Sequence, residues 1–418
     1  MHRRSFLTGA SGLAVYGLPR ILYSRDRALR VGVVGGGIVG ASLAYHLAQA
    51  GADVTLFEKI KPAAGATEKS LAWINPIVLD KRYMALRLES MLAWRSLNGP
   101  LDLRVIWGGS ISWTNHPERA TAVTSRALAL QNTFDVPRVL NAEDFETISP
   151  ATTPGPIAAA FFAPADGQVD PVWATHRFLD HAQRLGAKIY FPCEVQALDL
   201  RAGKLAGAAT TRGKFALDRL IIAAGVDTPH VLSMVGYGLR LKHDPRIMAH
   251  SLPTRELTRI VYAVSGELEF KQMGSGRIAA TFEHGPPDIP VHREILDHAI
   301  DFPSDALRKM HGEMVFKEVS QFMPAARNTT LDRVMLAFRP MPLDGLPVVG
   351  AVPGTADVYV VVTHSGVTLA PILGRYATQE VLSGKLVDRL ADYRPGRFSE
   401  SSSSGHDRSL QVEKPRTR

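Results

Sequence analysis

The sequence predicts an α/β fold in which a parallel, dinucleotide-binding sheet is joined to a second, α+β part built on an antiparallel sheet. The first part is indicated by an apolar strand at 29–34, glycines spaced G-x-G-x-x-G, and a helix at 38–50. A second apolar strand at 54–57 then ends in an acidic residue. The second part is indicated by 239–332, where short alternating segments are typical of antiparallel strands.

Each glycine of the first turn has its own function. Gly35 makes the turn, Gly37 lets the backbone approach a pyrophosphate, and Gly40 lets the helix pack closely on the strand. A βαβ unit without a ligand is the alternative, but strand, glycines, helix and terminal acid together favour a bound dinucleotide in a Rossmann-type domain. The acid lies where a carboxylate reaches a ribose 2′-hydroxyl, which predicts an adenine-containing ligand without a 2′-phosphate. The residues expected to contact this ligand also include Ile38, Val39, Glu58 and Lys59.

Composition excludes several other functions. Of the 418 residues, 45% are hydrophobic and 21% charged, as in a globular protein of one or two domains. The net charge of +8 arises at the two ends, because 1–30 carry six arginines and one aspartate, and 394–418 are also basic. The region between is close to neutral, so no nucleic-acid partner is expected. A single cysteine, Cys193, excludes an internal disulfide and a cysteine metal cluster, and no metal site is predicted.

The N-terminal segment 1–28 differs from the rest of the chain. Arg3-Arg4-Ser5-Phe6-Leu7 resembles a twin-arginine export signal, and a weakly apolar stretch follows. The alternative is a disordered basic tail, since the stretch is short and lacks a clear cleavage site. The protein is therefore expected in the cytoplasm or the periplasm, with membrane association only through this segment. Fusion of 1–30 to a reporter that requires twin-arginine transport distinguishes the two.

The middle of the chain alternates helices and strands. A helix is expected at 83–97 with Gly99-Pro100 as its stop, and most of the nearby tryptophans are expected in the core. Strands are expected at 104–115, 157–162, 188–191, 193–198 and 220–224, a hairpin at 205–217, and helices at 120–131, from 141, and at 172–185. In the resulting second layer of the dinucleotide fold, Val195 is expected against adenine, and Ala224 and Gly225 beside the ribose and pyrophosphate.

The pattern divides the chain into segments. The cofactor domain is expected at 29–238, with part of the substrate domain inserted around 100–165, and the substrate domain at 239–332 with a proline-rich stretch at 285–290 and a helix at 303–316. The chain returns to the cofactor domain over 333–393, with a strand at 358–362 and a helix from about 366–368 to 382. Pro371 is expected in the first turn of that helix. Residues 394–418 are expected to be disordered.

Four motifs resemble a known family. They are the glycine turn, Asp166-Gly-Gln-Val-Asp170, Arg339-Pro340 with Asp344-Gly-Leu-Pro-Val-Val-Gly350, and His364-Ser-Gly-Val-Thr-Leu-Ala-Pro371. Over about 29–390 the chain resembles the D-amino-acid oxidase superfamily of FAD enzymes, which includes glycine oxidase, sarcosine oxidase and small D-amino-acid dehydrogenases. The resemblance implies FAD as cofactor, a glutathione-reductase-like cofactor domain, and a large antiparallel sheet over the flavin.

The resemblance also implies roles for individual residues. Arg339 is expected to anchor a substrate carboxylate, because a guanidinium binds carboxylate at two points; pairing with a nearby acid is the alternative. The helix start at Gly366, Val367 and Thr368 is expected to stabilise the reduced flavin through its positive end, with His364 assisting. Contacts with the cofactor are also expected from Thr67, Ser70 and Gly345, with Lys69 and Ala72 in the same loop, while Lys271 is a candidate for the substrate pocket.

The reaction expected is oxidation of the CH–NH bond of a D-amino acid, glycine or an N-methyl amino acid. Hydride passes to flavin N5, the imine hydrolyses, and oxygen or a respiratory electron carrier reoxidises the flavin. Oxidation of a hydroxy acid and a non-catalytic flavin subunit are the alternatives. No cysteine stands in the C-terminal motifs, so FAD is expected to be noncovalent and to be released on denaturation.

Overall fold

The computed structural model describes residues 28–283 and 301–398, which form two domains. The first is built on a six-stranded sheet in which all neighbouring strands are parallel except β20 and β21, which form an antiparallel pair at one edge. Its strands, in spatial order, are β20 (Val348–Val352), β21 (Thr355–Val362), β12 (Arg219–Ile222), β1 (Arg30–Val34), β2 (Asp53–Phe57) and β8 (Lys188–Tyr190).

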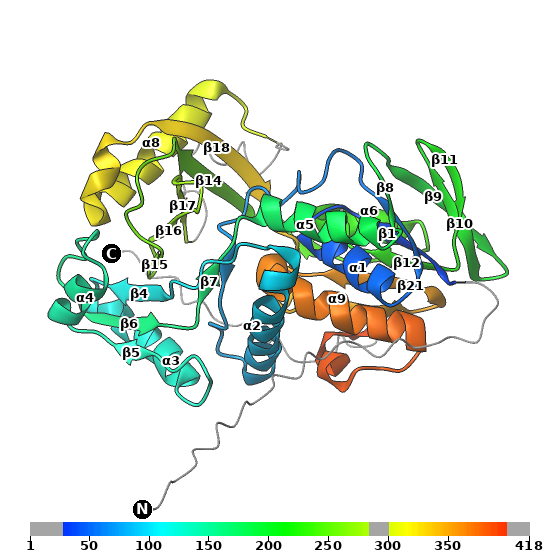
Figure 1. Ribbon diagram of the computed structural model, residues 1–418, viewed down its shortest axis with the longest axis horizontal. Helices are drawn as coiled ribbons and strands as arrows, with labels where there is room; N and C mark the ends of the chain where they lie inside the picture. The colour runs from blue at the N-terminus through cyan, green and yellow to red at the C-terminus, as the bar shows by residue number, and fades with distance from the viewer. Residues whose placement is uncertain (1–27, 284–300, 399–418) are drawn as a thin grey trace, which may run out of the picture.

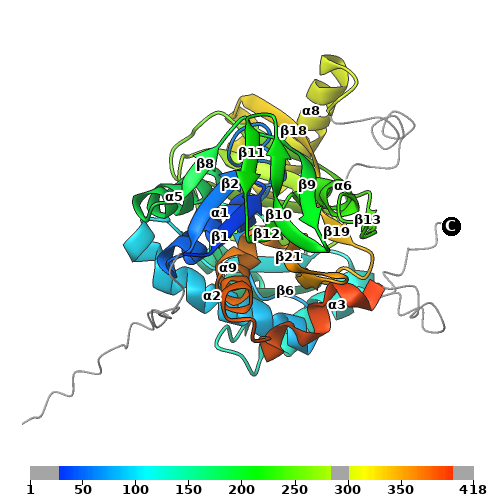
Figure 2. The same cartoon turned by 90° about the vertical axis from the view of Figure 1, so that its right-hand side faces the viewer.

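Different layers cover the two faces of this sheet. One apolar core joins it to α1 (Ile38–Gln49), α5 (Pro171–Arg184) and α9 (Gly366–Ser383), with α2 (Lys81–Leu101) packed outside them. A second core joins the other face to α6 (Thr228–Ser233) and a three-stranded sheet of β9 (Val195–Arg201), β10 (Lys204–Thr210) and β11 (Gly213–Ala216). Figure 2 looks at this end, with β9–β11 above and α9 and α2 below. The predicted Rossmann-type α/β fold is confirmed.

The second domain, on the left of Figure 1, is built on an eight-stranded sheet. It is antiparallel except where β15 runs parallel to β4, so the expectation of an antiparallel sheet holds at every other pair. Its strands, in spatial order, are β18 (Leu331–Phe338), β14 (Pro245–Ser251), β17 (Ile278–Phe282), β16 (Leu268–Gln272), β15 (Val261–Val264), β4 (Ser110–Thr114), β6 (Ala159–Ala163) and β5 (Arg138–Val139).

The two faces of the eight-stranded sheet differ in chemistry because successive side chains on a strand point to opposite sides. One face carries Ile247, Phe270 and Ile278, which pack with the helix α8 (Asp305–Phe322) in an apolar core. The other face carries Arg246 and Glu269, and it is turned toward the first domain. The buried polar face therefore belongs to a site between the domains.

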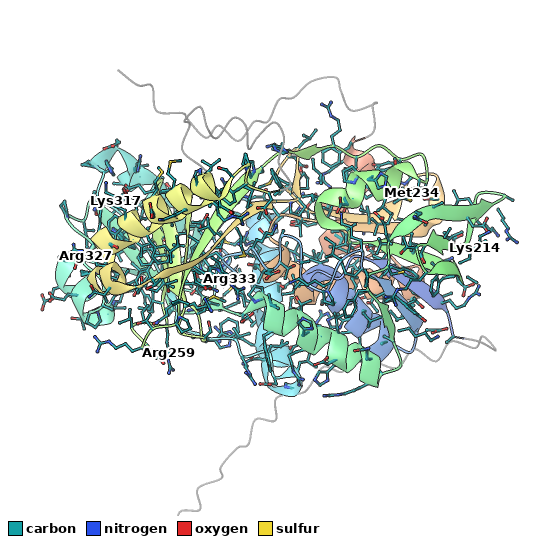
Figure 3. All side chains as sticks on the ribbon, turned by 90° about the horizontal axis from the view of Figure 1, so that it is seen from above. Lys214, Met234, Arg259, Lys317, Arg327 and Arg333 are labelled. Atoms are coloured by element: carbon teal, nitrogen blue, oxygen red, sulfur yellow. The ribbon has the colours of Figure 1, made fainter. Side chains whose placement is uncertain are left out.

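Figure 3 shows the two domains from above. Lys214 and Met234 mark the far end of the first domain in this view, and Lys317 and Arg327 mark the far end of the second. None of the described helices is long and apolar enough to span a membrane. The remaining elements are β3 (Trp73–Ile74), β7 (Gly167–Gln168), α3 (Ala120–Leu130), α4 (Ala142–Ile148), β13 (Leu241–Lys242) and β19 (Met341–Pro342), with short 3-10 turns at 117–119, 225–227, 324–328, 388–393 and 395–398.

In two helices, a proline lies at a different position in the helix from the one that the sequence predicted. Helix α2 continues through Gly99 and Pro100 and ends at Leu101, followed by the capping residue Asp102, whose backbone is left-handed with φ 52°. Pro371 is the sixth residue of α9, beyond the first turn. A proline there leaves the carbonyl four residues earlier without its helical donor, and Trp94 Nε1 donates to that carbonyl, on Val367, at 3.0 Å. The expectation that Pro371 requires the first turn was therefore wrong.

Several predicted boundaries also differ. The strand β18 pairs with β14 along its whole length, so the second domain extends to Phe338 rather than to 332. Helix α8 is displaced toward the C-terminus relative to the expected 303–316, and the strand expected at 104–115 is regular only over β4. The segment 394–398, expected to be disordered, is ordered because Arg394 pairs with Glu380. The N-terminal segment up to 27, the proline-rich stretch 285–290 and residues 399–418 lie outside the described residues.

Candidate active site

Two cavities meet between the domains. The first runs along the carboxyl ends of β1, β2 and β12, and the second lies between the first domain and the polar face of the eight-stranded sheet. Both are lined by Ala66, Ser70, Pro340, His364 and Val367. The loop after β2 and the segment before α9 therefore stand where the two cavities join.

Glu58 presents its carboxylate to the first cavity. Its two oxygens accept hydrogen bonds from the backbone N–H groups of Gly36 at 2.7 Å and Ile60 at 2.8 Å. These bonds hold the carboxylate in place and leave further lone pairs for hydroxyl donors. Gly36, which sequence reasoning did not single out, is required here, because a Cβ would lie 2.9 Å from the Cβ of Glu58.

The glycine turn has the geometry that its spacing predicts. Gly35 has φ +108°, and a Cβ on it would lie 2.4 Å from the carbonyl oxygen of Ala223. A Cβ on Gly40 would lie 1.9 Å from the carbonyl oxygen of Gly35, so this glycine serves helix packing and does not line either cavity. The backbone N–H of Ile38 donates to Thr67 Oγ1 at 3.1 Å, which joins the loop after β2 to the start of α1.

The structure divides the other residues expected to hold the cofactor between the cavities. Lys59 lines the first and pairs with Asp227 at 2.7 Å. Thr368 and Gly345 line only the second cavity. Residues of the expected set that line the first are Gly35, Gly37, Ile38, Val39, Glu58, Lys59, Thr67, Ser70, Val195, Ala224, Gly225, Gly366 and Val367.

His364 stands at the junction of the cavities in a neutral state. Its Nε2 lies 3.0 Å from Ser365 Oγ, which also accepts a hydrogen bond from Arg87 Nη1 at 3.0 Å. Burial, together with the charges of Arg87, Arg339 and Arg246, lowers the pKa of His364 to about 3. Since the Ser365 oxygen accepts from Arg87, we assign its proton to the bond with Nε2, which places the imidazole proton on Nδ1. Nδ1 is buried and has no partner among the described residues.

Arg339 lies in a cavity, as expected for a residue that binds substrate, and the same cavity contains a second arginine. It lines the second cavity, and its Nε donates to Asp244 Oδ2 at 2.7 Å. Arg246 lines the same cavity and pairs with the other oxygen of Asp244 at 3.6 Å. The acid that was the alternative partner for Arg339 is therefore present, and it is shared between two guanidinium groups.

The structure places Lys271 behind the cavity wall. Its side chain is buried, and Nζ donates to the carbonyl oxygens of Ala72 at 3.3 Å and Val169 at 3.2 Å. Burial lowers its pKa to about 7, and Asp170 opposes that change. Lys271 does not line either cavity, so the expectation that it forms the pocket is not met. It instead holds the loop at Ala72, which does line the second cavity.

The residues of the first cavity fit FAD. The glycine turn would leave space for a pyrophosphate, the Glu58 carboxylate would take ribose hydroxyls, and α9 begins without a side-chain cap beside the orphan Nδ1 of His364. Cys193 lines this cavity next to Val195, far along the chain from the His364 segment. Within the described ranges, no group of three or more His, Cys, Asp or Glu side chains has an arrangement that could hold a metal ion.

Comparison with known proteins identifies relatives with named activities. The mitochondrial dimethylglycine dehydrogenase of Homo sapiens is 24% identical over 397 residues, which are 90% of this chain and 45% of that protein. The chain thus spans less than half the length of this relative. Glycine oxidase of Bacillus licheniformis is 23% identical over 84% of this chain and 92% of its own length.

Solved structures share the fold. L-proline dehydrogenase from P. horikoshii superposes with a TM-score of 0.77 at 20% identity, covering 90% of this chain and 99% of that one. The family model described as FAD dependent oxidoreductase matches residues 30–380, so FAD is the cofactor and the protein is an oxidoreductase related to amino acid oxidases and dehydrogenases. The chain belongs to the family of FAD dependent oxidoreductases.

Proposed function

We propose that this chain oxidises the CH–NH bond of a small amino acid: a D-amino acid, glycine or an N-methyl amino acid. The observation that carries the proposal is the pair of arginines in the second cavity. Arg246 and Arg339 share the single carboxylate of Asp244, which leaves one guanidinium charge in excess. A substrate carboxylate would neutralise that charge and would fix one end of the substrate beside the cofactor.

The protein's contribution to this reaction is binding and orientation. When bound, FAD supplies the chemistry, accepting the electrons and the hydrogen that leave the substrate carbon. Arg339, restrained by Asp244, would hold the substrate carboxylate, and the cavity of about 660 Å³ has room for a small amino acid. His364, which lines both cavities, remains neutral near pH 7 and would carry its proton on the buried Nδ1.

The names of the relatives support this substrate class. Dimethylglycine dehydrogenase, glycine oxidase and L-proline dehydrogenase are each named for an amino acid. They differ in whether the nitrogen is primary, secondary or tertiary, so the names support an amino acid but do not select one. The oxidant is proposed to be oxygen or a respiratory electron carrier, and the site of action the cytoplasm or periplasm. FAD is proposed to be held without a covalent bond.

Anaerobic bleaching of the bound flavin tests the proposal. The FAD-loaded enzyme would be mixed with D-alanine, D-proline, glycine, sarcosine and D-lactate in turn, and its visible absorption followed. Bleaching by an amino acid, with release of ammonia or an amine in air, supports the proposed reaction. Bleaching by D-lactate alone assigns a hydroxy acid as substrate, and no bleaching by any compound contradicts the proposed function.

A further inference from the structure

Glu269 lies at the centre of a row of residues that crosses the eight-stranded sheet. In register, Ser112 of β4 faces Ala263 of β15, Ala263 faces Glu269 of β16, and Glu269 faces Thr281 of β17. All four residues line the second cavity. Because the neighbours of Glu269 in this row are alanine and threonine, they are too short to cover its carboxylate, which therefore faces the cavity.

No side chain of the described residues pairs directly with this carboxylate. Within 28–283 and 301–398, the Glu269 side chain makes no hydrogen bond or ion pair, although Arg126, Arg246 and Arg339 act on its charge from a distance. Each of these arginines has another acid: Arg126 pairs with Glu283 at 3.4 Å, and the other two share Asp244. Ionisation of a buried carboxyl without a paired cation is costly, so such a group either keeps a proton or binds a cation.

The charges around Glu269 form two opposite poles. Asp244 balances only one of Arg246 and Arg339, which leaves a positive pole, and Glu269 is a negative pole on the same wall of the cavity. A substrate that carries a carboxylate and an ammonium group matches both poles. A hydroxy acid matches only the first. The arrangement therefore favours a dipolar amino acid and orients it across the sheet.

We propose that Glu269 binds the ammonium group of the substrate and accepts the proton that this nitrogen loses before oxidation. The inference rests on the proposed function, since it concerns the amine end of the same substrate. In the step, an N–H bond of the ammonium breaks, its electron pair stays on nitrogen, and the proton bonds to a Glu269 oxygen. The neutral amine then has the lone pair that oxidation of its C–H bond requires.

The surroundings of Glu269 suit a proton acceptor near neutral pH. Burial and the charge of Glu283 raise the pKa of Glu269, Arg339, Arg246 and Arg126 lower it, and the balance of these effects places it at about 7. Glu283 follows the end of β17 and Arg339 follows β18, whereas Arg246 belongs to β14 and Arg126 to α3. The carboxylate is therefore increasingly ionised as pH rises through 7, and its attraction for an ammonium group increases in the same direction.

The test compares glycine and acetate as ligands of the FAD-loaded enzyme. Acetate carries the carboxylate without the amine, and spectral changes of the flavin report the apparent Kd of each ligand between pH 5.5 and 9. Glu269→Gln should weaken glycine binding about 10-fold or more and acetate binding less than about twofold. In the unaltered enzyme the Kd of glycine should fall as pH rises through 7, and in Glu269→Gln this dependence should disappear.

Two further variants act as controls. Glu267→Gln removes a carboxylate that belongs to the same hairpin and pairs with Arg119 outside the cavity, so glycine binding should stay unchanged. Glu269→Asp retains the charge and should retain the pH dependence, even if binding weakens. Equal glycine affinity and equal pH dependence in the unaltered enzyme and Glu269→Gln would overturn the inference.

The result also separates this inference from the proposed function. Glu269-dependent binding of glycine without flavin bleaching by any amino acid would support ammonium binding and contradict the oxidation. Bleaching by amino acids with the same affinity and pH profile in Glu269→Gln would support the oxidation and refute the role of Glu269. Failure of the unaltered enzyme to bind glycine more tightly than acetate at pH 8 would also refute it.

Discussion

Asp244 accepts a hydrogen bond from Arg339 through both the side chain and the backbone. Arg339 Nε lies 2.7 Å from Asp244 Oδ2, and its backbone N–H lies 2.9 Å from the Asp244 carbonyl oxygen. The guanidinium is thus held in one orientation, with Nη1 free of any partner in the described residues. A restrained guanidinium binds a carboxylate with less loss of conformational entropy.

Replacement of this guanidinium should weaken substrate binding. We expect Arg339→Lys to raise the KM for the amino acid substrate about 10- to 100-fold with a smaller effect on kcat, because an ammonium cannot bind carboxylate at two points. Steady-state kinetics on the FAD-loaded enzyme measure both constants. Arg333→Lys, which changes a half-exposed arginine outside the cavities, is the matched control. An unchanged KM in Arg339→Lys would refute the assignment.

Ser365 should determine which nitrogen of His364 carries the proton. With Ser365 Oγ accepting from Arg87 and donating to Nε2, the neutral imidazole carries its proton on Nδ1. Nitrogen NMR of the ¹⁵N-histidine-labelled protein should show this tautomer throughout pH 5–9, since the pKa is about 3. Ser365→Ala should populate the other tautomer. A His364 ring that titrates near pH 6.5, or a tautomer that the substitution does not alter, contradicts the interpretation.

Glu58 should contribute to the affinity for FAD. We expect Glu58→Gln to raise the Kd of FAD about 10-fold or more, because an amide cannot accept from both Gly36 N–H and Ile60 N–H as the carboxylate does. Titration of the apoprotein with FAD, followed by flavin fluorescence, measures this Kd. Glu68→Gln changes a carboxylate in the same loop that is absent from both cavities, and its Kd should match the unaltered protein.

Gly40 should be required for folding rather than for contact with the cofactor. A Cβ there meets the carbonyl oxygen of Gly35 at 1.9 Å, so Gly40→Ala should destabilise the protein by about 1–3 kcal/mol or more. Denaturant unfolding measures the loss. Gly99→Ala meets no atom within 4 Å and should leave stability unchanged or slightly higher. Equal stability of the two variants would contradict the packing role.

The buried carboxyl group of Asp166 should make the stability of the protein fall as pH rises. Burial raises the pKa of Asp166 well above its ordinary value, and Asp135 raises it further. The folded state therefore keeps a proton that the unfolded chain releases above pH 4, so stability falls as pH rises toward the folded pKa. Asp166→Asn, which imitates the protonated form, should flatten this fall of Tm above pH 4, whereas Asp180→Asn on the surface should not.

The features predicted from sequence are those encoded in short segments. The turn at Gly35 and the carboxylate of Glu58 follow from local spacing, and the structure places both in the first cavity. Arg246 and Glu269 were missed because they meet only through the order of strands in the eight-stranded sheet. The available signal was Glu269 between the apolar Leu268 and Phe270, which indicates a polar face but not what that face covers.

Pro371 shows a different limit of sequence reasoning. Its position in the second turn is tolerated because another helix supplies the donor, which comes from Trp94 on α2. Lys271 was also assigned incorrectly, since the backbone carbonyls that bind it belong to segments distant in sequence. In both cases a tertiary hydrogen bond determines where the residue lies, and no local sequence pattern indicates such a bond.

The hydrogen bonds around Pro371 also bear on how this enzyme could change its substrate. Ser90 Oγ donates to the Thr368 carbonyl at 2.6 Å, Ser42 Oγ to the Ala370 carbonyl at 2.8 Å, and Trp94 to Val367. The start of α9 is therefore tied to two neighbouring helices by buried bonds, and a shift there would break several at once. Adaptation to a new amino acid is consequently easier on the opposite wall, where single side chains on β-strands can be exchanged without disturbing the cofactor's support.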